Sequence, residues 1–98
     1  MKHIFASKKL QRLYSEKDYS AGYSHEIVKA FRKRVQQIAA ARDERDLYAL
    51  KSLHFEKLKG SRSHQRSIRL DKQYRLILEI QRDAGGNVMI LIDIEDYH

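Results

Sequence analysis

Apolar residues in the first half of the chain recur at the three-to-four-residue spacing of an α-helix with one buried face. Helices are predicted to begin after Ser7, Ser24 and Asp43, because these residue types cap helix N-termini with a side-chain oxygen. The second helix should extend to about residue 42, and a short strand can precede the first at residues 3–6. The side chains expected to face the core are Leu10, Leu13 and Tyr14, then Ile27, Phe31, Val35 and Ile38, then Leu47 and Leu50.

From His54 onward the apolar period changes to two, the alternation of a strand with one buried face. Strands are predicted at residues 67–71, 74–81 and 88–95, with Gly85 and Gly86 in the hairpin that joins the last two. The residues expected to face the core are Ile68, Leu70, Tyr74, Leu76, Leu78, Ile80, Val88, Ile90, Ile92 and Ile94. The pattern predicts an α+β fold in which two to three N-terminal helices pack on one face of a sheet formed by residues 54–97.

The alternation also predicts how the last two strands pair. Leu78 lies opposite an even-numbered residue only if paired residue numbers add up to an even value, which needs an odd number of loop residues. With residues 85–87 as the loop, paired numbers add up to 172 and Arg75 lies opposite Tyr97. A tight link at residues 71–73 then brings Arg69 next to Arg75. The face away from the helices is therefore expected to carry both arginines and Tyr97.

Length and composition narrow the class of protein. A chain of 98 residues is expected to form a single domain, residues 1–98, with one core and no deep cofactor cavity. The net charge of +7 favours a polyanionic partner, foremost a nucleic acid. The absence of cysteine excludes disulfides and thiolate zinc sites and fits a reducing compartment. No apolar run reaches the length of a membrane span or signal peptide, so we expect a cytoplasmic protein with no membrane partner.

Positive charge is concentrated in a basic stripe at residues 57–75, which holds seven Lys or Arg and one acid. The basic residues of the stripe are Lys57, Lys59, Arg62, Arg66, Arg69, Lys72 and Arg75. Cutting RNA without a metal needs a base for the 2′-hydroxyl, cations for the developing charge and a proton donor. His54 and His98 can titrate near neutral pH. Arg69 and Arg75 can hold a phosphate, and Tyr97 can stack on a base or donate a proton.

Each of these residues also has a structural interpretation. The stripe can be a solvated surface, His54 a half-buried residue at the start of a strand, and the two arginines cross-strand partners of Asp71 or Glu79. Residues 97 and 98 lie at a chain end, where fraying is expected. The basic face at residues 29–34 can solvate the second helix or help it to dock on a large RNA. The residues alone predict a nucleic-acid-binding domain and leave open whether it cuts RNA.

Motifs for phosphate loops, serine hydrolases and zinc peptidases do not occur in the sequence. The only spacing that suggests a metal site, His54 to His64, lacks further ligands. The sequence therefore predicts neither a metal nor a cofactor.

Several motifs resemble the HigB-type toxins of the RelE superfamily, the plasmid maintenance killer family, over essentially the whole chain. They are Ser7-Lys-Lys-Leu, Leu53-His54, Leu58-Lys59-Gly60, Ser67-Ile68-Arg69, Gln73-Tyr74-Arg75 and Ile94-Glu95-Asp96-Tyr97-His98. The resemblance implies a microbial RNase fold with helices on one face of a mainly antiparallel sheet. It also implies a metal-independent endoribonuclease that cleaves mRNA in the ribosomal A site. The implied partners are that mRNA, the ribosome and a cognate HigA-like helix-turn-helix antitoxin.

The resemblance also assigns roles to residues. It places His54, Asp96, Tyr97 and His98 in the cleavage step, and Lys57, Arg69 and Arg75 as cations for the phosphate and the transition state. We expect three further residues of the basic stripe to contact the RNA as well, namely Lys59, Arg62 and Arg66. The base is predicted to be His98 or His54, with Asp96 orienting a partner.

The loop at residues 61–66 departs from the family pattern. Relatives often have an acid after Gly60, then Arg-Lys-Gly-Gln and an aromatic, where this chain has Ser61, Arg62, Ser63, His64, Gln65 and Arg66. The change predicts less base stacking and more contact with phosphates or ribosomal RNA. The alternative function is a non-catalytic RNA- or DNA-binding module that uses the same basic face.

Overall fold

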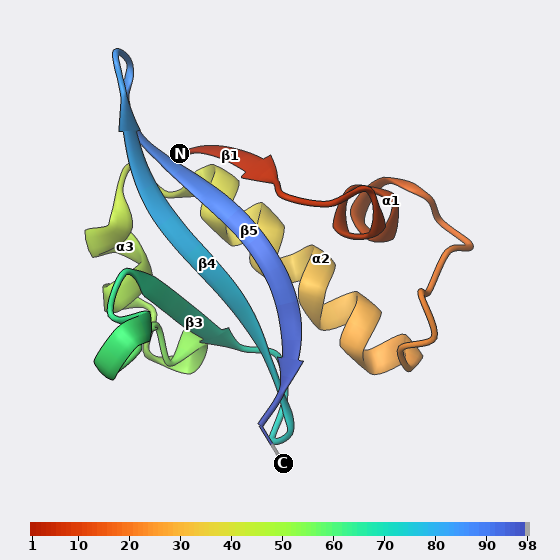
Figure 1. Ribbon diagram of the computed structural model, residues 1–98. Coiled ribbons are helices and arrows are strands. Elements are labelled where there is room, and N and C mark those ends of the chain that lie inside the picture. Colours follow the sequence, from red (N-terminus) through yellow and green to blue (C-terminus); the bar gives the residue numbers. More distant parts are fainter. Residues whose placement is uncertain (98) are drawn as a thin grey trace.

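The computed structural model describes residues 1–97 as helices packed on one side of a five-stranded sheet (Figure 1). The helices are α1 (Lys8–Ser15), α2 (His25–Ala40) and α3 (Glu44–Ala49), followed by 3-10 turns η1 (Lys51–Leu53) and η2 (Gly60–Arg62). The strands are β1 (Lys2–Phe5), β2 (Glu56–Lys57), β3 (Gln65–Arg69), β4 (Tyr74–Asp83) and β5 (Gly86–Asp96), in the spatial order β1-β5-β4-β3-β2. The predicted α+β class is confirmed. None of the described helices is long and apolar enough to cross a membrane.

The sheet is antiparallel except at one edge. β1 pairs in parallel with β5, from Lys2 opposite Val88 to Phe5 opposite Leu91. The strand predicted at residues 3–6 is therefore present, but it joins the sheet, which the prediction confined to residues 54–97. Strands β2, β3, β4 and β5 form antiparallel neighbours. Figure 1 looks onto the sheet with α2 behind β4 and β5, so the opposite face, here called the open face, is turned toward the viewer.

The predicted caps start all three helices. The side chains of Ser7, Ser24 and Asp43 each accept a hydrogen bond from a backbone N–H two or three positions further on. The apolar stripe of α2 is buried throughout and packs against the sheet. The prediction that Leu50 faces the core is wrong, because this residue is 42% exposed. Helix α3 ends at Ala49, and the turn η1 that follows buries Leu53 instead.

The β4–β5 hairpin does not have the predicted three-residue loop. Asp83 pairs with Gly86, so the loop is only Ala84 and Gly85, and paired numbers add up to 169 as far as Leu78 opposite Leu91. A β-bulge then shifts the sum to 170, leaving Ile92 without a partner on β4. An extra residue in one strand reverses the faces of all residues beyond it.

The bulge decides which residues of β5 reach the core. Met89 and Leu91 are fully buried on the helix side before it, and Ile94 is buried there after it. The prediction that Ile90 and Ile92 line the helix-side core is therefore wrong, whereas Val88 is buried, as predicted, but lies outside that core. Arg75 lies opposite Glu95, and the predicted pairing with Tyr97 is wrong as well.

Candidate functional site

One row of the sheet brings three charged side chains together on the open face. Arg69 pairs with Arg75, and Arg75 pairs with Glu95, on strands β3, β4 and β5. Leu76, the next residue after Arg75, is fully buried in the helix-side core, so strand alternation places Arg75 on the other face. The prediction that both arginines lie on the open face is confirmed.

Arg75 is the central cation of this site. Its side chain is buried, with the whole residue 9% exposed, and one terminal NH2 donates to the backbone oxygen of His54 over 2.7 Å. The guanidinium carbon lies 5.6 Å from the centre of the Tyr97 ring. The Nε is buried and donates to no acceptor among residues 1–97, and no carboxylate in that part of the chain forms an ion pair with Arg75. A buried cation with a spare donor favours an anionic ligand.

His54 reaches the site through an unusual backbone conformation. It caps the turn η1 with φ 47° and ψ 49°, the left-handed region that a non-glycine residue adopts at a cost of about 1–3 kcal/mol. This conformation turns its carbonyl toward Arg75 and its ring toward Arg69, whose NH1 lies 3.4 Å from Nε2. Arginine can only donate, so this contact is a hydrogen bond when Nε2 carries no proton. His54 is exposed, which excludes the half-buried interpretation.

The turn at residues 71–73 holds the end of β5. Gln73 donates from its side chain to Asp96 over 3.0 Å, and its backbone oxygen accepts from the N–H of Tyr97 over 2.6 Å. Tyr97 is 45% exposed and lies beside Arg75. Asp96 pairs in register with Tyr74, so alternation directs its carboxylate away from the row of Arg75. His98 lies outside the described residues.

The rest of the basic stripe is divided between two faces. Lys57 pairs with Arg66, and Arg66 pairs with Leu78, whose side chain belongs to the helix-side core. Strand register therefore places Lys57 and Arg66 on the side away from Arg75, where the Arg66 guanidinium donates to the backbone oxygens of Ser63 and Gln65. Lys59 is exposed next to η2.

Arg62 projects over the open face and is held by an acid there. Its two terminal nitrogens donate to the two carboxylate oxygens of Glu95 over 3.0 and 2.7 Å, and its Nε donates to Gln65 over 2.8 Å. The hydrogen bonds to Glu95 raise the pKa of Arg62 above its ordinary value. The alternative structural interpretation, in which Arg69 or Arg75 pairs with Asp71 or Glu79, is not what the structure shows.

Glu95 and Gln73 are the site residues that the sequence reasoning missed. Glu95 belongs to the terminal motif, but its place beside Arg75 depends on the bulge in β5. Gln73 stands in the Gln-Tyr-Arg motif, and its contacts to residues 96 and 97 depend on the folded turn. Residues 1–97 hold no group of three or more potential metal ligands.

Comparisons with known proteins show which fold and which family the chain shares. The chain is similar to a solved structure of the YoeB/ParE toxin from Agrobacterium tumefaciens, with a TM-score of 0.60 over 100% of both chains at 14% sequence identity. No curated protein sequence matches it. Residues 3–98 match the family described as the RelE-like toxin of type II toxin-antitoxin system HigB. The chain belongs to this family, which confirms the resemblance in its motifs, and membership implies an antitoxin as partner.

Proposed function

We propose that this toxin is a ribosome-dependent endoribonuclease that cuts mRNA in the A site and works in the cytoplasm without a metal ion. The observation that carries the proposal is the buried Arg75 guanidinium, which has a spare donor and lies beside Arg69, His54 and Tyr97. Two arginine forks in one row can hold both non-bridging oxygens of a phosphate. The expected protein partner is a neutralising antitoxin of the HigA-like helix-turn-helix kind.

The reaction needs three functions at that phosphate. A base takes the proton of the 2′-hydroxyl, the 2′-oxygen attacks phosphorus, and the bond to the 5′-oxygen breaks as this oxygen receives a proton. Arg75 and Arg69 stabilise the negative charge that develops on the phosphate oxygens. We assign the base to His54 or His98 and the stacking or donor role to Tyr97, and we assign Asp96 to orient a partner. Lys57, Lys59, Arg62 and Arg66 contribute to RNA binding.

The substitution Arg75→Ala tests the proposal. It should lower the single-turnover rate of A-site mRNA cleavage by about two to three orders of magnitude, the loss typical of one transition-state donor. Ribosome pelleting should be nearly unchanged, because many other cations remain. Arg75→Lys should restore only part of the rate, since a point charge cannot make a two-pronged contact.

Arg82→Ala is the matched control, because Arg82 is an exposed arginine near the tip of the same strand. It should cleave at the wild-type rate. If Arg75→Ala also cleaves at that rate, or loses cleavage only in proportion to lost ribosome binding, the assignment is wrong. The alternative of a non-catalytic RNA-binding module would then be favoured, because a binding module needs the cations but no transition-state donor.

A further inference from the structure

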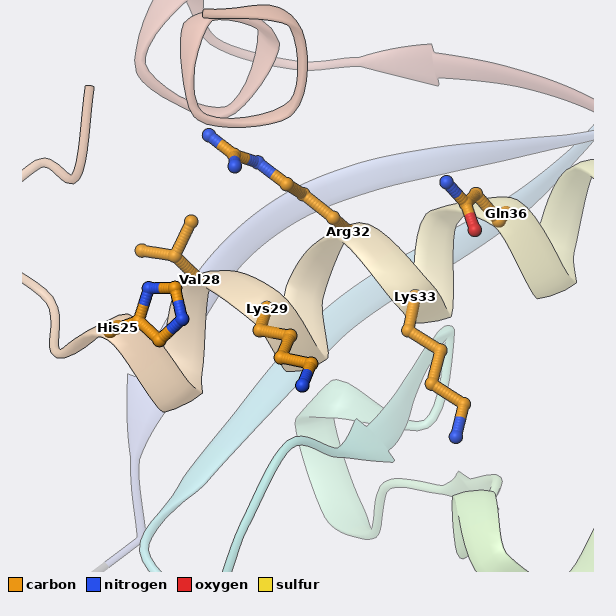
Figure 2. A pocket seen from close by; sticks show the side chains of 6 residues that line it. All are labelled: His25, Val28, Lys29, Arg32, Lys33 and Gln36. Atoms are coloured by element: carbon orange, nitrogen blue, oxygen red, sulfur yellow. The ribbon is translucent and has the colours of Figure 1, made fainter. Parts of the chain in front are cut away.

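The outer flank of α2 carries a second group of cations, on the side of the sheet opposite the open face. Lys29 precedes the buried Phe31 by two positions and Lys33 follows it by two. Each lysine is therefore about 160° around the helix from Phe31 and points away from the core. Together with His25, Val28, Arg32 and Gln36 they line a shallow hollow (Figure 2). Figure 2 shows Lys29 and Lys33 extending in the same direction from the helix, whereas Arg32 points toward α1. This surface is called the α2 flank below.

The charges of the α2 flank are not balanced by acids. Glu26 is the only acid in the helix, against four Lys or Arg between positions 29 and 34. None of these four forms an ion pair with a carboxylate of residues 1–97, whereas cations elsewhere on the surface do, as in the pairs Lys2–Asp83, Lys9–Asp93 and Arg12–Glu16. A helix face that only needs solvation commonly mixes both signs in i,i+4 pairs. The α2 flank instead presents one sign.

Two of the four cations have structural roles, and two do not. Arg32 donates to the backbone oxygens of Leu13 and Glu16 over 2.9 and 2.8 Å and so closes the end of α1. Arg34 donates to the backbone oxygen of Arg69 over 3.2 Å, and burial lowers its pKa below the ordinary value. Lys29 and Lys33 are exposed and make no contact of this kind within the described residues. Neither lysine is needed to hold the fold together.

The tyrosines next to the flank indicate which form of RNA it suits. Tyr19 and Tyr23 line an adjoining hollow that shares His25, Val28 and Arg32 with the flank. Both rings already have a partner within the protein. The Arg12 guanidinium lies 3.9 Å from the centre of the Tyr19 ring. The Tyr23 and Tyr74 rings pack edge to face. Single-stranded RNA is commonly held by free aromatic rings, whereas duplex RNA is bound through its backbone.

We propose that the α2 flank is a second RNA-binding surface, which takes the phosphate backbone of an RNA double helix through Lys29 and Lys33. The sheet separates this surface from the site on the open face, because α2 covers the opposite side of the sheet (Figure 1). The toxin can therefore hold structured RNA on one side and the substrate strand on the other. This binding goes beyond the cleavage reaction and does not require the open face to be catalytic.

The double variant Lys29→Gln/Lys33→Gln tests the proposal with a labelled 16-base-pair RNA duplex in a salt series followed by fluorescence anisotropy. Loss of two phosphate contacts should reduce the slope of log affinity against log salt by about 1.8. If the loss is purely electrostatic, this reduction in slope corresponds to roughly 60-fold weaker duplex binding at 0.1 M salt. The control Lys8→Gln/Arg82→Gln removes the same charge from exposed positions on α1 and near the hairpin tip, and its effect should be much smaller.

Equal losses in the two double variants would overturn the proposal, because they would report only net charge. Unchanged duplex binding together with weaker antitoxin binding would also overturn it and assign the α2 flank to a protein partner. Melting temperatures equal to wild type would show that both variants fold. The duplex assay involves no cleavage, so it remains informative if the wild-type protein fails to cut mRNA and the proposed function is rejected.

Discussion

The pair between Arg62 and Glu95 predicts that Arg62, for which we propose a role in RNA binding, is kept from contacting RNA by an acid on the same face. The pair is two-pronged, with distances of 3.0 and 2.7 Å, and it ties η2 to β5 across the open face. Glu95 is also the register partner of Arg75. Glu95→Gln should free Arg62 to contact a phosphate and remove a negative charge beside Arg75. RNA binding should become tighter and more sensitive to salt.

The expected magnitudes follow from the exposure of the pair and from counterion release. The Arg62 and Glu95 side chains are 42% and 37% exposed, so breaking their pair should cost less than about 1 kcal/mol of folding free energy. One additional phosphate contact on single-stranded RNA steepens the salt slope by about 0.7. At 0.1 M salt this slope corresponds to roughly fivefold tighter binding.

The assay is anisotropy of a short single-stranded RNA whose 2′-hydroxyls are methylated, so that it binds without being cut. Glu16→Gln is the matched control, because Glu16 forms a similar two-pronged pair with Arg12 on α1, with distances of 2.9 and 3.3 Å. Both substitutions raise the net charge by the same amount and both release an arginine. The double variant Glu95→Gln/Arg62→Gln should return the slope to about the wild-type value.

Two results would refute this reasoning. If Glu16→Gln steepened the slope as much as Glu95→Gln, the effect would come from net charge and not from the place of the pair beside the site. If Arg62→Gln left the gain of Glu95→Gln intact, the released arginine would not be the group that contacts RNA. Either outcome would mean that the Arg62–Glu95 pair only holds η2 against β5 and does not affect RNA binding.

Two predictions concern stability. Phe31→Ala should lower the free energy of unfolding by about 3–5 kcal/mol, measured by urea denaturation, because Phe31 is fully buried where α2 meets the sheet. Hydrogen bonds from the side chain and backbone of Arg45 lower the pKa of Asp43 from 3.8 to about 2, so its ionised form adds stability above pH 3.8 that is lost as pH falls through about 2. Asp43→Asn keeps a capping side chain but should flatten the fall in melting temperature over that range, and an unchanged pH profile would contradict the assignment.

The helices could be predicted because their signals are local. Ser7, Ser24 and Asp43 each precede an apolar stripe at helical spacing, and each caps the helix that follows. The exposed Leu50 shows the limit of this reasoning. It continues the spacing of the stripe, but α3 ends one residue earlier, and where a short helix ends is set by the packing of the segment after it.

The register of the hairpin could not be predicted, because residues 88–92 are all apolar. Alternation carries no information about faces in a run where both sets of residues are hydrophobic. The pairing is set instead by the two-residue loop and by the bulge at Ile92. Both features depend on how the strands pack as a sheet.

The bulge has a direct consequence for the chemistry of the open face. With the predicted register, Arg75 would lie opposite Tyr97, and the row of arginines would contain no acid. With the observed register, Glu95 completes the row of Arg69 and Arg75 and takes Arg62 as its partner. A phosphate that enters this row must therefore approach a carboxylate as well as cations. Under the proposed function, a phosphate compound that makes few other contacts should bind this row weakly, because only an RNA held by several further contacts offsets the repulsion from Glu95.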